Sequence, residues 1–329
     1  MNEDLDMKNI TVLHNGGGWI TNIGNAFLDL GSMESIREAC PEADIHLTSV
    51  LNRWISHHID KGVTGRLLNK PAYIDNTFNL QDYAKVDYVT QSGAFLAKHW
   101  FDLHGKVLLN LKEKGIRLII NGGGMTDSSY NEVEIENTRD YLKKLKPYLF
   151  ISRDEKSFEN YKDLAEHAYN GIDVAFFLSN FYKPPKLNLP PYIALNFDKE
   201  VEPNIEVLGI DTDAFIVRTH HSFWHNFHLR DFIKMKSYYY DRENTMISEI
   251  PHDYLNVYAN ANSTYSDRVH ACVATFSYGN PAKLFGRTPR SLLFDRIGAS
   301  EITKKVVTPD MAKVNIEKKK QASFLSEVL

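Results

Sequence analysis

The chain has 329 residues, which is too long for one ordinary hydrophobic core, so we expect two domains. Its hydrophobic fraction of 43% and charged fraction of 24% are typical of a soluble globular protein. The formal net charge of -4 argues against general nucleic-acid binding, so no nucleic-acid partner is expected.

The amino-terminal residues and the cysteines indicate a cytoplasmic protein that is not integral to a membrane. Residues 1–6 are acidic and lack the basic-then-apolar order of a signal peptide, and no apolar run approaches a membrane span. Cys40 and Cys272 lie far apart and beside apolar residues, which is typical of reduced, buried thiols. The sequence leaves the oligomeric state open, and a homo-oligomer is compatible with it.

Short β-branched runs alternate with helical stretches in the first half of the chain, which predicts a parallel α/β sheet. Strands are expected at residues 10–13, 44–48, 86–90, 117–120 and 148–151. Four of these strands end in loops of small or polar residues, at 14–25, 91–94, 121–128 and 152–157. Because ligands bind at the carboxyl ends of parallel strands, these loops are expected at one rim.

Glycines in two of these loops are candidates for close approach to an acceptor or an anion. The residues concerned are Asn22, Gly24 and Asn25 in the first loop, and Gly122 and Gly123 in the third. The first loop leads into an expected helix, whose positive end suits a phosphate or a carboxylate. The dinucleotide spacing G-x-G-x-x-G is absent, and turn geometry alone explains any single glycine equally well.

Arg153 is a second kind of candidate, because it follows directly on the fifth expected strand. It precedes Asp154, Glu155 and Ser157, which suit the start of a helix. The arginine either pairs with these acids or binds an anion, and this stretch alone favours neither interpretation.

Residues 182–191 read Tyr-Lys-Pro-Pro-Lys-Leu-Asn-Leu-Pro-Pro and predict an extended, semi-rigid connector. We therefore expect an amino-terminal domain over residues 1–182, a linker over 183–191, a carboxy-terminal domain over 192–300 and a tail over 301–329. In the second domain, strands are expected at 192–197, 214–217 and 281–285, and helices at 254–261 and 269–278. The tail is predicted as a solvated helix without a site.

The stretch from His220 to His228 combines four histidines with three aromatic residues. It lacks a matching set of carboxylates or thiolates, so metal binding is the less favoured interpretation and no metal is predicted. A packing surface or a sugar-stacking surface explains the aromatics better.

Arg268 and His270 precede a run of small and apolar residues that is predicted as a buried helix ending at Gly279. In an extended segment, residues two apart point to the same side, so the two side chains can converge on one ligand. A fixed cation and a titratable imidazole suit an anionic ligand that must also exchange protons. The alternative is an arginine that caps a carbonyl beside a core histidine, and an isolated R-x-H favours that alternative.

Five short motifs together resemble the polysaccharide pyruvyl transferase family, in a plausible order over roughly residues 10 to 285. They are Asn22-x-Gly24-Asn25, Ser152-Arg153-Asp154-Glu155-x-Ser157, Asp173-x-Ala175-Phe176, Ser266-x-Arg268-x-His270-Ala271 and Gly279-x-Pro281-Ala282. The resemblance implies an α/β, glycosyltransferase-B-like architecture of two Rossmann-like domains with a cleft between them. It also implies transfer of pyruvate from phosphoenolpyruvate onto paired hydroxyls of a sugar or polysaccharide precursor, as a cyclic ketal.

The resemblance also implies roles for individual residues. Arg153 and Arg268 are expected to bind the donor, phosphoenolpyruvate, with Ser266 and His270 beside them. His270 and Arg268 are the expected catalytic residues, because an imidazole can both give and take protons near neutral pH. The amino-terminal domain forms the acceptor side and contributes Arg153, while the carboxy-terminal domain forms the donor side. Phosphoenolpyruvate is the donor substrate, and no cofactor is required.

One position departs from the family pattern, and two other functions compete with this one. The family's first loop has an aspartate where this chain has Asn25, which keeps hydrogen bonding but removes a carboxylate. The nearest competitor is a glycosyltransferase of the same architecture with a nucleotide-sugar donor, for which Glu249 and Asp253 are the carboxylates to consider. The other is a non-catalytic member that binds glycans through the aromatic stretch.

Overall fold

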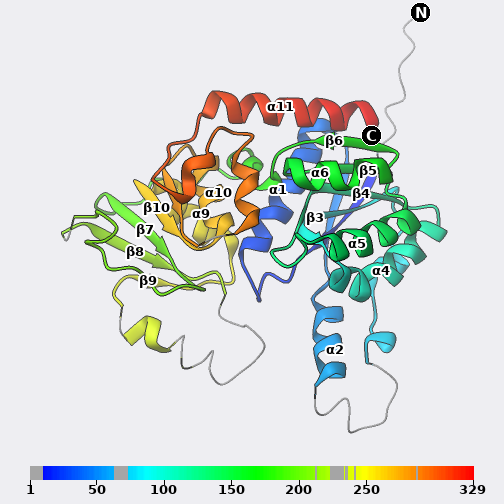
Figure 1. Ribbon diagram of the computed structural model, residues 1–329, viewed down its shortest axis with the longest axis horizontal. Helices are drawn as coiled ribbons and strands as arrows, with labels where there is room; N and C mark the ends of the chain where they lie inside the picture. Colours follow the sequence, from blue (N-terminus) through cyan, green and yellow to red (C-terminus); the bar gives the residue numbers. More distant parts are fainter. Residues whose placement is uncertain are drawn as a thin grey trace, which may run out of the picture.

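The structure, a computed structural model, describes residues 10–62, 73–211, 213–222, 233, 236–240, 242–286 and 288–329. Two parallel sheets lie side by side, each in its own domain (Figure 1). The first has the order β2-β1-β3-β4-β5-β6 and the second the order β11-β10-β7-β8-β9. Both orders reverse direction at the first strand of the domain, as in doubly wound folds, and confirm the predicted α/β class.

The bounds of the elements are as follows. The first sheet consists of β1 (Thr11–Gly16), β2 (Asp44–Ser49), β3 (Tyr88–Leu96), β4 (Arg117–Met125), β5 (Leu149–Ser152) and β6 (His167–Asn170). The second consists of β7 (Tyr192–Asn196), β8 (Phe215–Thr219), β9 (Thr245–Met246), β10 (Ser263–Ser266) and β11 (Ala282–Leu284). The helices are α1 (Gly24–Ala39), α2 (Leu51–Lys61), α4 (Lys98–Glu113), α5 (Glu132–Leu145), α6 (Glu155–Tyr161), α7 (Leu178–Phe181), α9 (Pro251–Asn260), α10 (Val269–Ser277) and α11 (Met311–Val328). Short 3-10 helices include η4 (Val174–Phe177) and η5 (Pro289–Phe294).

Helix α1 joins the two domains, because its first turns lie between them (Figure 1). Phe27 is fully buried and packs edge-on against Tyr254 and Tyr258 of α9, at ring-centroid distances of 6.5 and 6.3 Å. Its cluster also contains Phe176 of η4 and Phe276 of α10. Burying such aromatic area favours one fixed arrangement of the domains and so fixes the start of α1 beside the second sheet.

The glycine-rich segments after the third and fourth expected strands are parts of the strands, so the prediction of loops at 91–94 and at the glycines of 121–128 is wrong. β3 continues to Leu96 and β4 to Met125. The register shifts around Gly93 and Gly122, whose φ angles are 92° and 71°. An extra residue in a strand forms a bulge, and glycine adopts the positive φ that this bulge requires.

The tail forms the predicted helix, α11, but this helix is not solvated all round. It extends from the carboxy-terminal domain across the amino-terminal one (Figure 1). Leu325 is fully buried in the cluster that contains Ile36 and Ile151, and Gln321 Oε1 accepts the N–H of Ile172 at 2.8 Å. The sequence prediction missed this face because lysines surround it.

Residues 182–191, between α7 and β7, carry neither helix nor strand. In the described part of the chain, no helix combines the length and apolar character needed to cross a membrane.

Candidate active site

The candidate site lies where the carboxyl ends of the two sheets face each other. Arg153 follows β5 of the first sheet, and it lies 3.4 Å from His270 Nε2 at the start of α10 in the second domain. Asp198 and Lys199 follow β7, and Arg268 follows β10. β7 and β10 are the neighbouring strands at which the second sheet reverses its order, the usual position of a ligand site in such sheets.

Arg153 is buried, with only 1% of its surface exposed. Its Nη1 donates to Asp173 Oδ2 at 3.0 Å, while its Nη2 is buried and has no hydrogen-bond partner among the described residues. Gly124 of β4 makes room for this side chain, since a Cβ there would lie 2.4 Å from Arg153 Nε. The neighbouring Asp154 does not pair with Arg153. Its carboxylate instead accepts the N–H and the hydroxyl of Ser157 and so caps α6. The local-pairing interpretation of Arg153 is therefore wrong.

His270 Nε2 faces both Arg153 and Asp173, at 3.4 and 3.5 Å. Burial lowers the pKa of His270, and the charges of Arg153 and Arg290 lower it further, while Asp173 opposes the shift. A neutral ring with an unprotonated Nε2 accepts from Arg153, and a protonated Nε2–H faces the Asp173 carboxylate. The ring is therefore placed to exchange a proton at Nε2.

The carboxylate of Asp173 contacts both Arg153 and His270. Burial by itself would raise the pKa of Asp173, but the hydrogen bond and charge of His270 and the charge of Arg153 lower it to about 2. Oδ1 accepts the N–H of Ala175 at 2.9 Å at the start of η4, which fixes the carboxylate. Asp173 belongs to one of the five motifs on which the family resemblance rests, but its contact with His270 was not predicted.

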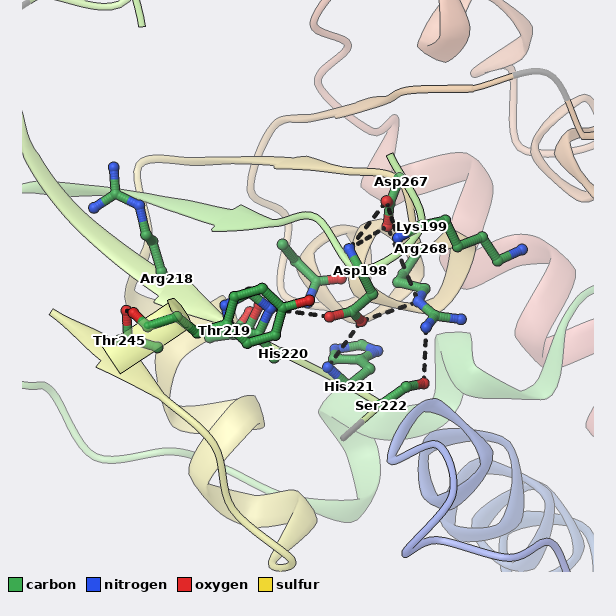
Figure 2. Close-up of polar contacts among 12 residues, drawn as sticks. Asp198, Lys199, Arg218, Thr219, His220, His221, Ser222, Thr245, Asp267 and Arg268 are labelled. Atoms are coloured by element: carbon green, nitrogen blue, oxygen red, sulfur yellow. Dashed lines mark hydrogen bonds and ion pairs between the residues drawn. The ribbon is translucent and has the colours of Figure 1, made fainter. Parts of the chain in front are cut away.

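Arg268 is anchored by Asp198, which also orients two histidines (Figure 2). Asp198 Oδ2 accepts from Arg268 Nε and from the backbone N–H of His221, both at 3.0 Å, and Oδ1 lies 3.0 Å from His220 Nδ1. Arg268 Nη2 also donates to Ser222 Oγ at 2.8 Å. Burial alone would raise the pKa of Asp198, but His220 and Arg268 hold it well below its usual range.

Ser266 and Asp267 have structural contacts, so the assignment of Ser266 to the donor is not supported. Ser266 is fully buried, accepts the N–H of Arg268 at 2.8 Å and donates to Asn196 Oδ1 at 3.0 Å. Asp267 Oδ2 accepts the backbone N–H groups of residues 198–200 at 2.6–3.0 Å. Its recorded hydrogen bonds are to this loop and not to His270 or to the N–H groups of α10. Both residues shape the loops that carry Lys199 and Arg268.

Arg290 and Lys199 are cations of the site that the sequence prediction missed. Arg290 lies on η5 and donates through Nε to Asp127 Oδ1 at 2.9 Å, and Lys199 Nζ lies 3.6 Å from Asp127 Oδ2. Burial lowers the pKa of Arg290, and the charges of Arg153 and Arg268 lower it further, which places it in the same electrostatic cluster. The available signal was Arg290's position a few residues after a strand, in a Thr-Pro-Arg turn.

The first loop reaches the site through Gly24. A Cβ on Gly24 would lie 3.4 Å from His270 Cβ and 3.4 Å from His221 Nδ1. Asn22 Oδ1 accepts the N–H of Gly24 at 3.1 Å, and Asn25 packs against Gly17 in the same loop. The loop therefore meets His270 through Gly24, while its two asparagines contact other residues of the loop.

Gly122 and Gly123 do not join this loop at the site. They lie inside β4, where a Cβ on Gly122 would lie 2.9 Å from Val174 and one on Gly123 would lie 2.4 Å from Ile120. Gly122 allows close packing of β4 against η4, and Gly123 allows close packing within β4, so neither lies in the predicted loop.

The aromatic stretch is described only from His220 to Ser222, and residues 223–228 lie outside the described residues. His221 is buried at 1% exposure, and its Nε2 lies 2.6 Å from Tyr258 Oη. Burial lowers its pKa to about 3, so the ring is neutral. His220 stacks on Tyr238 with ring centroids 3.6 Å apart. These two rings are core groups and offer no exposed stacking face.

Comparison with known proteins gives a family and a fold. The family model of the polysaccharide pyruvyl transferases matches residues 22–286. None of the curated proteins compared with the sequence matches it. Three solved structures with similar folds are the S. aureus MnaA–UDP complex, a putative UDP-N-acetylglucosamine 2-epimerase of Listeria monocytogenes and the UDP-N-acetylglucosamine 2-epimerase of Rickettsia bellii.

The MnaA structure has 11% identity and a TM-score of 0.55, with 97% of this chain and 91% of that chain covered. The Listeria structure has 13% identity and a TM-score of 0.53, with coverages of 98% and 91%. The Rickettsia structure has 12% identity and a TM-score of 0.52, with coverages of 97% and 94%. At such identities the likeness establishes the fold alone, which is the predicted glycosyltransferase-B-like pair of Rossmann-like domains.

Proposed function

The chain belongs to the polysaccharide pyruvyl transferase family, and we propose that it transfers pyruvate from phosphoenolpyruvate to paired hydroxyls of a glycan or glycan precursor. The products are a cyclic ketal and inorganic phosphate. The donor carries a carboxylate and a phosphate close together, so its binding site needs several cations with fixed geometry.

One observation carries the proposal: a buried guanidinium with a free N–H group beside a buried imidazole. Arg153 Nη2 has no hydrogen-bond partner among the described residues, and a buried donor left unsatisfied costs about 1–3 kcal/mol or more when it is charged. Arg153 and His270 come from different domains yet lie 3.4 Å apart. An anion bound beside this pair would accept the N–H of Arg153 Nη2 and bring a reacting group to the imidazole.

The other cations support the same ligand. Arg268, Arg290 and Lys199 come from three further segments. Burial lowers the pKa of Arg290 and of Lys199, and the charge of Arg268 lowers both further, so the three cations interact. Each is paired with a carboxylate in the free protein, which keeps the cations close together without a ligand. Phosphoenolpyruvate has enough negative charge to engage several of them at once.

We assign the proton transfer to His270. The reaction begins with a proton delivered to the methylene carbon of the donor, which makes the neighbouring carbon electrophilic. One sugar hydroxyl adds there and loses its proton, phosphate leaves, and the second hydroxyl closes the ring. Burial lowers the pKa of His270, and the negative charge of the donor would oppose this shift and favour the imidazolium that delivers the proton.

The acceptor side is assigned to the first loop. Gly24 lies against His270, and Asn25 replaces the family aspartate. Because this loop meets His270, we assign to His270 the removal of the hydroxyl proton as well.

Calorimetric binding of phosphoenolpyruvate and release of phosphate in the presence of an acceptor panel test the function. Arg153→Ala should weaken donor binding by about 100-fold or more, as expected when one partner of a buried charge pair is removed. His270→Ala should bind the donor but release no phosphate. Turnover at the normal rate by His270→Ala would exclude the acid–base assignment.

A second candidate is an enzyme that acts on a nucleotide sugar, because the similar folds include a UDP complex. Its two candidate carboxylates offer little support: Asp253 accepts from Ser248 Oγ at 2.6 Å, and Glu249 is exposed. A thermal-shift comparison separates the functions. Stabilisation by UDP-N-acetylglucosamine but not by phosphoenolpyruvate would favour the nucleotide sugar.

A further inference from the structure

The carboxylate of Asp127 is bound by groups of the opposite domain. Asp127 lies between β4 and α5 in the amino-terminal domain. Its Oδ1 accepts from Thr288 Oγ at 2.6 Å and from Arg290 Nε at 2.9 Å, and its Oδ2 lies 3.6 Å from Lys199 Nζ. Among the described residues, all the recorded hydrogen bonds and ion pairs of this carboxylate are to the carboxy-terminal domain.

The groups that hold Asp127 form a receptor for a carboxylate or a phosphate. They supply a hydroxyl, a guanidinium and an ammonium from two separate segments, which is the donor set that anion sites use. Burial lowers the pKa of Lys199, and the like charge of Arg290 lowers it further, so the two cations favour an anion at the position that Asp127 occupies. The charge of Arg268 also lowers the pKa of both Arg290 and Lys199, which places this receptor next to the candidate donor site.

We propose that Asp127 is an internal ligand that occupies one anionic subsite of the donor site and leaves it when phosphoenolpyruvate binds. The inference rests on the proposed function, because it identifies that subsite with one for the donor. Binding of the donor then exchanges one carboxylate for another at Arg290 and Lys199. When Asp127 leaves, its contacts with Thr288, Arg290 and Lys199 are lost. These contacts join the two domains at this edge.

Asp127 differs from the other carboxylates of the site in how easily it can leave. Its side chain is 43% exposed, whereas those of Asp173 and Asp198 are 0% and 1% exposed. Asp173 and Asp198 each accept backbone N–H groups as well as side-chain donors. An exposed ion pair contributes little, so an incoming anion displaces Asp127 before it displaces the buried pair.

The test compares Asp127→Asn with wild type in calorimetric binding of phosphoenolpyruvate and, separately, of inorganic phosphate. Asparagine keeps an oxygen for Thr288 but removes the competing charge, so we expect phosphoenolpyruvate to bind about three- to tenfold more tightly. Asp163→Asn is the matched control. Asp163 is 55% exposed and pairs with Arg139 at 2.6 Å without contacting the site, so this variant should bind as wild type does.

The outcomes separate this inference from the proposed function. Tighter binding by Asp127→Asn alone supports the internal ligand. Unchanged or weaker binding by Asp127→Asn, with normal binding by wild type, overturns it and makes Asp127 a residue that positions Arg290. If wild type binds no phosphoenolpyruvate, the proposed function fails, and tighter binding of inorganic phosphate by Asp127→Asn still decides whether the carboxylate competes with anions.

Discussion

The most specific prediction concerns Gly124, which touches no ligand and yet fixes the position of Arg153. An ideal Cβ at this position lies 2.4, 3.1 and 3.2 Å from Nε, Cγ and Cδ of Arg153. Contacts between such atoms are normally about 3.5–4.0 Å, so Gly124→Ala forces a displacement of about 1 Å. Arg153 is only 1% exposed, so its side chain cannot move out into solvent. Its guanidinium must therefore move relative to Asp173.

The expected effect is much larger on activity than on stability. A misplacement of about 1 Å costs roughly 100-fold in rate, and we expect kcat/KM for phosphate release to fall by about that factor in Gly124→Ala. Overpacking costs about 1–3 kcal/mol of unfolding free energy, which a two-state domain usually survives. Phosphate release and calorimetric donor binding measure the first effect, and urea unfolding measures the second.

Gly105→Ala is the matched control for this variant. Its Cβ would lie 3.7 Å from Tyr141, an ordinary contact, in the interior of α4. The replacement should keep full activity and stabilise the helix by up to about 1 kcal/mol. A Gly124→Ala protein with the expected loss of stability but wild-type kcat/KM would refute the placement of Arg153 at the reacting group.

Three further predictions follow from the same geometry. Arg290→Lys keeps the charge but loses the planar fork, so phosphoenolpyruvate should bind about tenfold more weakly, and unchanged calorimetric affinity would remove Arg290 from the site. Asp173→Asn removes the carboxylate that opposes the lowering of the His270 pKa, so the limb of the kcat/KM–pH profile that depends on His270 should move to lower pH; a shift upward would contradict the contact. Ser266→Ala leaves two buried partners unsatisfied, so unfolding should be easier by about 1–3 kcal/mol while donor affinity stays unchanged, and a large loss of affinity would restore the role expected from sequence.

The sequence was sufficient to predict the parallel sheets, whereas only the family resemblance suggested that Arg153 and His270 serve one ligand. Strand-and-loop alternation is local, and residues that follow parallel strands must lie at one edge. Arg153 directly follows β5 and His270 lies at the start of α10, and the structure brings the two side chains to 3.4 Å.

The errors have physical causes that one sequence does not reveal. A run of three glycines is compatible with a loop and with a bulged strand, and only the neighbouring strands decide which forms, as Gly122 and Gly123 demonstrate. Ser266 lies in a motif beside Arg268, but its hydroxyl is satisfied by Asn196, which is 70 residues away. Arg290 reaches the site from a turn in η5, and no local pattern distinguishes it from a surface arginine.

The pairing of the four cations with three carboxylates is consistent with a site that is stable and can still bind an anion. Asp173 and Asp198 are buried and tied to backbone N–H groups, so they hold Arg153 and Arg268 at fixed positions whether or not an anion is present. Displacing either would leave a buried charge unpaired, at a cost of about 3–5 kcal/mol. Asp127 is half exposed, so the anion enters where the compensating carboxylate is held least strongly. Under the proposed function, the greater exposure of Asp127 than of Asp173 and Asp198 favours entry of the donor beside Arg290 and Lys199.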